Sequence, residues 1–516
     1  MFPEREIKLS PVNTGTDYVL PDYMGDIRKM LNQSVRILPS GRFVSESEAT
    51  FVGVVCYTVV YLDNENKLTE ASFTSDYEYG IKIGEEFIDA DSSCTISGIS
   101  IRPSAPRKLS ARATLCPIVS ITEDKAPPSP EIKDCIQILP SAVRESSLEI
   151  LRVGEREYAE EGARLQGVQA EEVQVLHCGG DAIITETAFR AGEIIINGAL
   201  ELYALLMIDG ATPLRIEKSI PITASAAYES EKDCEMITEV IMPSLRVTVN
   251  DTVTENGDGG SSDEPITSVV FNATVDYTVK AYGNRETSVA LDAFSTEGDC
   301  ECKYREYGYS EFLGVVHEEI PLSFEIDRRE LEMNEIGDIL SQEGRFNLIL
   351  CEPEDGAVKM EGDLMLALLM QVPDEMGYVL QKSTQRIEHT FKIPYTSSGN
   401  LKINPKASVC GLQVTVDNSK LYVKCKIVCE MSVKESRKMH IVEEMTTNVS
   451  ENQEKHCGIV TVYYPDKNDT LWEIAKKYRK SMASIAEENM LSSDCLADGG
   501  TVKLEDIERI IITKNI

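Results

Sequence analysis

Residues that commonly carry enzyme chemistry are scarce in this chain. Five histidines and one tryptophan occur among 516 residues, and His317, His389 and His440 lie apart from a plausible nucleophile. No G-x-S-x-G, H-E-x-x-H or phosphate-loop string is present. Acidic pairs occur throughout, as expected with 86 acidic residues, so the choice of two as a glycosidase dyad would be arbitrary. The sequence therefore predicts a protein that is not an enzyme and that uses no cofactor.

Positive charge and long apolar runs are also in short supply. The chain has 51 basic residues against 86 acidic ones and a formal net charge of −35. Binding to a nucleic acid needs concentrated Lys and Arg, and anionic lipids repel an acidic chain, so we expect no nucleic acid and no direct membrane insertion. No segment approaches the ~18 apolar residues of a membrane span. The start, MFPEREIKLSPVN, lacks the basic end and apolar run of a signal peptide, so we expect a cytoplasmic protein.

Paired cysteines are absent as well, although the chain contains 14 cysteines. They are spread singly and many sit in apolar runs, such as Cys56 in FVGVVCYTVVY, so we interpret them as small buried side chains in a reducing compartment. Cys425 and Cys429 are four residues apart on one strand, roughly 13 Å, too far for a disulfide. The chain has no C-x-x-C pair of the kind that binds a structural zinc ion, so we expect no metal site. The role of Cys300 and Cys302 stays open.

Apolar residues, by contrast, are sufficient for folded domains, and they recur in a pattern. Hydrophobic residues make up 42% of the chain. Three segments share a glycine, a long apolar strand, a polar turn and a second strand, and they are centred on Gly53, Gly198 and Gly362. A second correspondence joins the fourteen-residue strings that begin at Gly25 and Gly337. These recurrences predict three copies of one domain that fold independently.

The strands of these copies alternate between apolar and polar residues. Val269 to Val279 and Val423 to Val433 both follow this period of two, as expected when one face of an antiparallel sheet is buried and the other is wet. We therefore predict a mainly β (α+β) fold of tandem β-sandwich-like repeats with short helices, plus a small C-terminal βααβ domain.

Polar and proline-rich stretches place the domain boundaries. We expect a linker at 123–133, a boundary near Tyr307 to Gly314 and a polar tether at 448–458. The acidic, glycine-rich segment 250–265 is interpreted as a mobile hairpin tip, with an acidic docking loop as the alternative. The predicted domains are a first repeat at 1–125, a second at 130–310, a third at 311–450 and a C-terminal domain at 457–516.

The C-terminal segment has clear helix signals. Thr470 and Glu473 form a T-x-x-E capping box, and the apolar residues that follow recur at helical spacing up to Tyr478. A second helix is predicted from Ser481, and a returning strand from Val502. A unit of this size buries little apolar core of its own. We therefore expect it to serve in recognition rather than in catalysis.

This order of elements, with D-T-L-W-x-I-A-x-x-Y at 469–478 and N-x-L at 489–491, resembles the LysM domain. The resemblance implies binding of the N-acetyl sugars of peptidoglycan or chitin between the loop that precedes the first helix and the loop that follows the second. Asn468 and Arg479 stand where that family usually has glycine, and their side chains could occupy this groove. The alternative is that Leu471, Trp472 and Leu491 simply fill the domain core. The residues predicted to contact a glycan or protein partner are Asn468, Asp469, Thr470, Leu471, Asn489, Met490, Leu491 and Ser492.

The repeats have a second resemblance. LPDYMGDIRKML at 20–31, the glycine-centred strand pairs and VALDAFSTEGDCECKY at 289–304 are similar to the SPOCS domain of spore-coat assembly proteins. That resemblance implies a mother-cell adaptor at the forespore surface that binds the ATPase of the coat basement layer, stage IV sporulation protein A, through its LysM-like domain. The alternative is a peptidoglycan-binding protein of the cell wall or cortex.

Overall fold

A computed structural model of the chain defines the fold. It describes residues 2–513 except 46, 84–86, 124–126, 128–134, 211, 230–233, 253–264, 332–335, 355, 373–376, 396–399, 418–419, 449–459, 467, 493–495, 497–499, 502–503 and 505–506. The predicted linker, acidic tip and tether therefore lie almost entirely outside the described residues.

The described chain is mainly β, as predicted. Strands make up 81% of the structure and helices 5%, and the α-helices of the described part lie in the C-terminal segment. The short helices expected in every repeat are not found in the described residues, where the 3₁₀ turn η1 (Ala170–Glu172) is the exception to an all-strand pattern. Strongly alternating sequences with few helix signals explain this outcome, because the period of two favours strands throughout.

Two compact units divide the chain. Unit 1 comprises Met1–Asp124, Ser147–Gly283 and Leu313–Lys434, and unit 2 comprises Lys125–Ser146, Asn284–Phe312 and Glu435–Ile516. The predicted boundary near Tyr307 to Gly314 falls inside one long strand, and the division between Phe312 of unit 2 and Leu313 of unit 1 lies within it.

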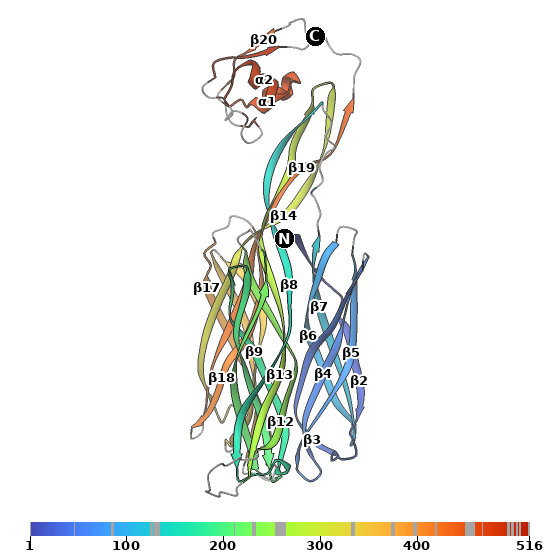
Figure 1. The fold of residues 1–516 in the computed structure, drawn as a ribbon, viewed down its shortest axis with the longest axis vertical. Coiled ribbons are helices and arrows are strands. Elements are labelled where there is room, and N and C mark those ends of the chain that lie inside the picture. Colours follow the sequence, from blue (N-terminus) through green and yellow to red (C-terminus); the bar gives the residue numbers. More distant parts are fainter. Residues whose placement is uncertain are drawn as a thin grey trace. The chain divides into compact units, whose positions relative to one another are not determined.

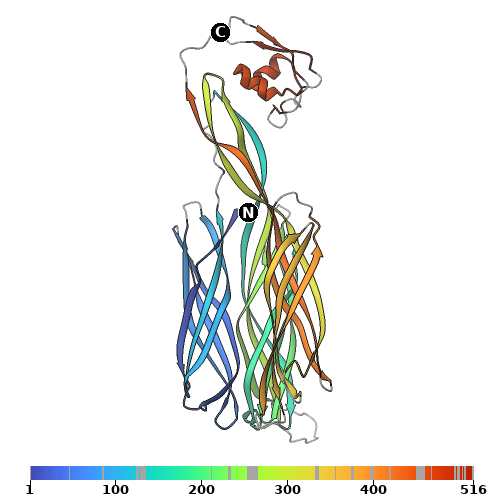
Figure 2. The same ribbon diagram turned by 180° about the vertical axis from the view of Figure 1, so that it is seen from behind.

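Unit 1 contains three bodies, each made of a three-stranded sheet and a second sheet that faces it (Figures 1 and 2). In the first body the sheet β3-β4-β5 faces the sheet that contains β1, β2, β6 and β7. The strands are β1 (Phe2–Lys8), β2 (Val12–Val19), β3 (Ile27–Val44), β4 (Glu48–Asp63), β5 (Leu68–Lys82), β6 (Phe87–Ala105) and β7 (Lys108–Glu123).

The second and third bodies repeat this plan. In the second, β9-β10-β11 faces strands of β8, β12 and β13; in the third, β15-β16-β17 faces β14, β18 and β19. The strands are β8 (Ile136–Gln166), β9 (Val173–Arg190), β10 (Glu193–Ile208), β11 (Thr212–Ala227), β12 (Glu235–Thr252), β13 (Ile266–Ser295), β14 (Asp299–Asp327), β15 (Asp338–Glu354), β16 (Ala357–Gln371), β17 (Tyr378–Lys392), β18 (Asn400–Asp417) and β19 (Lys420–Asn448). Strand β1 also pairs with β8, which joins sheets of the first and second bodies.

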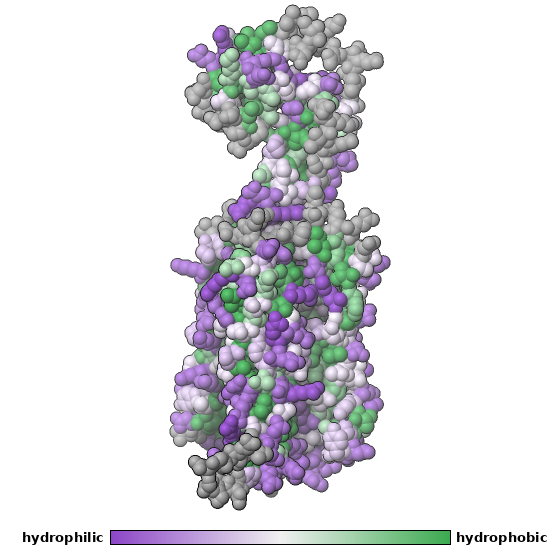
Figure 3. Space-filling model, in the orientation of Figure 1, coloured by the Kyte–Doolittle hydropathy of each residue, from purple (hydrophilic) through white to green (hydrophobic). Residues whose placement is uncertain are grey.

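Each body has its own apolar core between its two sheets. The alternation predicted for Val269 to Val279 and for Val423 to Val433 is confirmed, because the apolar members of both runs are buried. On the face drawn in Figure 3, hydrophilic and hydrophobic side chains are mixed over the strands of unit 1.

A glycine lies near the middle of each central strand because the neighbouring strand bulges toward it. Gly53 in β4, Gly198 in β10 and Gly362 in β16 all lie at a register shift against the first strand of their sheet. A Cβ atom at these positions would lie 2.5, 2.3 and 2.7 Å from the carbonyl oxygens of Leu38, Ile183 and Asn347, respectively. The repeated glycine is therefore a requirement of a β-bulge that all three sheets share.

A second shared bulge brings the three bodies together. Leu31, Leu176 and Leu340 each lie at a register shift 22 positions before the central glycine of their sheet. All three belong to one buried apolar cluster, which we call the junction core; its other buried members are Val60, Leu62, Leu68, Leu205, Met207 and Leu369. Equivalent residues of the three bodies thus pack against one another inside unit 1.

Candidate functional site

The C-terminal segment has the predicted βααβ order. The elements are β20 (Val460–Tyr463), α1 (Leu471–Tyr478), α2 (Met482–Glu488) and β21 (Ile510–Thr513). The predicted capping box of α1 is confirmed, with the Thr470 hydroxyl accepting from the Glu473 N–H at 3.2 Å and the Glu473 carboxylate accepting from the Thr470 N–H at 3.4 Å. Ser481 caps α2 in the same way by accepting from the Ser484 N–H at 3.2 Å.

The returning strand differs from its prediction. It is β21, which pairs antiparallel with β20, whereas Val502 lies outside the described residues. Leu504 is buried in a loop, where its N–H donates to the Asp469 carbonyl at 3.1 Å. Its apolar character therefore reflects burial rather than a strand.

The first candidate loop, 468–471, is held by its own polar groups. The Asp469 carboxylate accepts from the Tyr463 hydroxyl at 2.7 Å and from the Asp466 N–H at 2.9 Å. These hydrogen bonds lower the pKa of Asp469 and raise that of Tyr463 to about 12. Leu471 is fully buried and Asn468 is exposed. Solvent therefore reaches the Asn468 side chain in this loop but not the leucine side chain.

In the second candidate loop, 489–492, one side chain ties two elements together by hydrogen bonds and another projects into solvent. The Asn489 amide donates to the carbonyls of Ile485 and Ile511 at 2.8 and 2.7 Å and accepts from the Ile511 N–H at 2.6 Å, so it ties α2 to β21. Met490 has φ 51° and is 94% exposed. A non-glycine residue in the left-handed region is uncommon.

The predicted contact residues therefore divide into two sets. Leu471 and Asn489 serve the fold of the domain, and the Thr470 hydroxyl and Asp469 carboxylate are engaged in local hydrogen bonds. Leu491 is half-buried against the domain core. The residues that present side chains outward are Asn468, Met490 and Ser492.

Trp472 is buried, but residues outside the C-terminal segment help to bury it. Its ring meets the Phe294 ring edge-on at 5.0 Å between centroids, and its indole N–H donates to the Asp292 carboxylate at 3.0 Å. Phe294 belongs to the same apolar cluster as Leu471 and Ile474. This contact could not be predicted from the sequence, because 180 residues separate Asp292 from Trp472.

Arg479 has the left-handed C-cap conformation in which the family usually has glycine, with φ 52°. Its guanidinium forms an ion pair with Asp299, also of unit 2. The Arg479 side chain is therefore engaged with that carboxylate, in contrast to the prediction that it could occupy the ligand groove.

A second polar cluster, which the sequence did not predict, lies in unit 1. The His177 ring contacts the Glu70 carboxylate through Nδ1 and the Tyr203 hydroxyl through Nε2 at 3.1 Å, and that hydroxyl donates to Glu343 at 3.0 Å. Burial alone would lower the pKa of His177, but Glu343 and Glu70 outweigh it and raise this pKa to about 9. The four residues come from all three bodies, so no local motif in the sequence could indicate this cluster.

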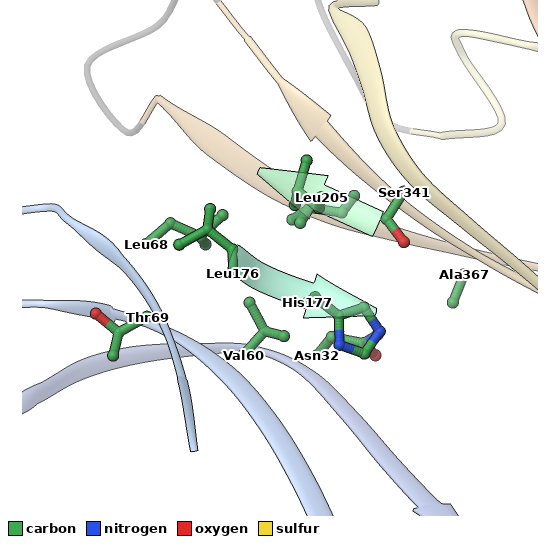
Figure 4. Close-up of a pocket in the computed structure, with 10 residues that line it drawn as sticks. Asn32, Val60, Leu68, Thr69, Leu176, His177, Leu205, Ser341 and Ala367 are labelled. Atoms are coloured by element: carbon green, nitrogen blue, oxygen red, sulfur yellow. The ribbon is translucent and has the colours of Figure 1, made fainter. Parts of the chain in front are cut away.

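The cavity beside this cluster is too small for a substrate. Its volume is about 10 Å³, about the space that one water molecule needs. Figure 4 shows His177 at this cavity with Asn32, Ser341 and the apolar side chains of Val60, Leu176 and Leu205. The arrangement suits a buried structural cluster better than a catalytic pocket.

The cysteines and possible metal ligands add no further site to the described part. The cysteines found there are free thiols. Cys300 and Cys302 lie with their sulfurs 3.7 Å apart, and no group of three or more potential ligands that could hold a metal ion occurs among the described residues.

Comparison with known proteins identifies the C-terminal segment. Among protein-family models, the LysM domain matches residues 466–497, a range that spans α1, α2 and both candidate loops. No curated protein and no solved structure matches the chain. Residues 466–497 thus form a LysM domain, which suggests peptidoglycan or another carbohydrate as the class of ligand. Within the described residues, no helix combines the length and apolar character needed to cross a membrane.

Proposed function

We propose that this chain is a binding protein without enzymatic activity, whose LysM domain binds a glycan of N-acetyl sugars, peptidoglycan above all. The observation that carries the proposal is the LysM match across 466–497, which includes both candidate loops. The glycan lies between the loops 468–471 and 489–492 and is contacted by the exposed side chains of Asn468, Met490 and Ser492.

The geometry of the two loops supports this use. Asp469 and Asn489 fix the loops through hydrogen bonds within the domain, which lowers the entropy cost of ordering them around a ligand. Met490 offers a flexible apolar side chain that can pack against the face of a sugar ring. Both loops are short and lie next to helices that are capped at their N-termini.

A co-sedimentation assay with the full chain and purified peptidoglycan tests the proposal. The wild-type chain is expected to pellet with peptidoglycan, and Met490→Ala is expected to bind about tenfold more weakly, which corresponds to about 1.4 kcal/mol. Val462→Ala, an exposed apolar position on β20, is the matched control and should bind like wild type. Absence of wild-type binding, or equal binding by Met490→Ala, would contradict the assignment of these loops.

A second candidate function is assembly of the spore coat. Three β bodies followed by one LysM domain resemble the layout of the clostridial spore morphogenetic protein SipL. On this hypothesis the chain acts in the mother-cell cytoplasm at the forespore surface and binds an ATPase like stage IV sporulation protein A. The observation that favours it is the exposed Asn468 side chain at a position where a sugar groove usually has glycine. Repeated bodies would add contacts that strengthen weak binding through effective concentration.

Parallel binding assays with peptidoglycan and with the purified ATPase distinguish the two functions. Retention of the full chain on peptidoglycan alone supports the first, and retention on the ATPase alone supports the adaptor. The Met490→Ala and Val462→Ala pair should be measured against both ligands, because a loss confined to Met490→Ala places that ligand at the loops.

A further inference from the structure

One helix of the LysM domain faces an acidic strand pair of the same unit. In unit 2, Asp292 on β13 accepts from the Trp472 indole N–H at 3.0 Å and from the Lys476 ammonium at 2.6 Å. The Tyr304 hydroxyl donates to the same carboxylate at 2.9 Å. Trp472 and Lys476 are four residues apart, so they lie on one face of α1. A single carboxylate therefore receives three donors, two of them from the LysM domain.

Apolar packing accompanies these hydrogen bonds. Phe294 lies two residues after Asp292 on β13 and meets the Trp472 ring edge-on, and both rings are 4% exposed. Aromatic pairs of this kind contribute more than their buried area alone. Phe294 is thus part of the apolar cluster of the LysM domain, although it lies far away in the sequence.

Charge complementarity extends the contact. The segment KKYRK at 476–480 is a basic run in an acidic chain, and Arg479 within it pairs with Asp299 at the start of β14. The turn between β13 and β14 also carries Glu297, and β14 carries Glu301. Burial alone would raise the pKa of Asp292, but hydrogen bonds from Lys476, Trp472 and Tyr304 outweigh it and lower this pKa, so the carboxylate stays charged at neutral pH.

We propose that the Trp472, Lys476 and Arg479 face of α1 is a protein-docking face, distinct from the glycan loops, and that its ligand is the acidic–aromatic hairpin Asp292–Asp299 of the same chain. The glycan loops stay accessible in this arrangement, because Asn468, Met490 and Ser492 are exposed. The LysM domain is therefore fastened to the hairpin by one face while another face is open to a ligand. The docking face is separate from the proposed glycan site, and its test needs no glycan.

The single tryptophan makes the docking directly measurable, because tryptophan emission reports on Trp472 alone. In the full chain, Asp292→Lys should shift the Trp472 emission to longer wavelength and raise its acrylamide quenching constant at least twofold. Glu301→Gln, on β14 two residues after this hairpin and with an exposed side chain, is the matched control and should leave the emission unchanged.

A charge exchange separates docking from simple unfolding of the domain. Asp292→Lys combined with Lys476→Glu should restore most of the wild-type quenching constant, since opposite charges again face each other. Phe294→Ala should increase quenching without being rescued by this exchange. Unchanged emission in both Asp292→Lys and Phe294→Ala, or failure of the double variant to recover, would overturn the docking face.

Discussion

His177 shows how one residue connects three parts of unit 1. Its ring contacts Glu70 of the first body, Tyr203 of the second and, through that hydroxyl, Glu343 of the third. A protonated imidazole donates from both nitrogens, which fits carboxylate and hydroxyl acceptors on its two sides. Because the folded state raises the pKa of His177 from 6.5 to about 9, the charged form is favoured by folding.

This linkage predicts a pH dependence of stability. The stabilisation from His177 is fully present below pH 6.5 and is lost as the pH rises through about 9. His177→Gln should lower the free energy of unfolding at neutral pH by about 1.5–3 kcal/mol, because it leaves two partly exposed carboxylates without the charged hydrogen-bond donor that they share. Denaturant unfolding at a series of pH values would measure both effects.

His389 provides the control for that measurement. It is a partly exposed histidine 3.3 Å from the Glu318 carboxylate. His389→Gln should change stability by less than about 1 kcal/mol. If His177→Gln were equally mild and kept the wild-type loss of stability between pH 6.5 and 9, the junction would not depend on a protonated histidine.

The elements of the repeats depend on bulges more than on alternation alone. Gly53 lies where a Cβ would meet the Leu38 carbonyl oxygen at 2.5 Å, whereas a Cβ at Gly98 would meet its nearest atom at 3.6 Å. Gly53→Ala should therefore lower the free energy of unfolding by about 1–3 kcal/mol, the usual cost of overpacking. Gly98→Ala, in the same body, should cost little. Chemical denaturation of both variants checks the difference, and equal costs would contradict the bulge explanation.

The strands and the capped helices could be predicted from the sequence, but the long-range contacts could not. The period of two and the T-x-x-E box are local signals, so they predicted the alternating strands and the start of α1 correctly. The shared glycine is visible in the sequence. The reason for it is not, because the carbonyl oxygen that excludes a Cβ atom there lies on another strand. Likewise, nothing local to Trp472 indicates that Asp292 and Phe294 lie against it.

At the scale of the whole molecule, the three repeats are not as separate as the sequence suggested. β1 pairs with β8, and equivalent leucines of all three bodies meet in the junction core within one compact unit. The three bodies thus share a common core, and the independent folding of each copy stays a prediction. The LysM domain belongs to the other unit, where it packs on its hairpin.

On the proposals above, the LysM loops bind a glycan while α1 stays docked on the hairpin. One NMR titration of the full chain, with labelled methionine methyl groups and the single tryptophan indole, follows both faces at once as an N-acetylglucosamine oligomer is added. We expect the Met490 methyl signal to move in a saturable way and the Trp472 indole signal to stay in place. An unmoved Met490 signal, or a Trp472 signal that moves instead, would contradict it.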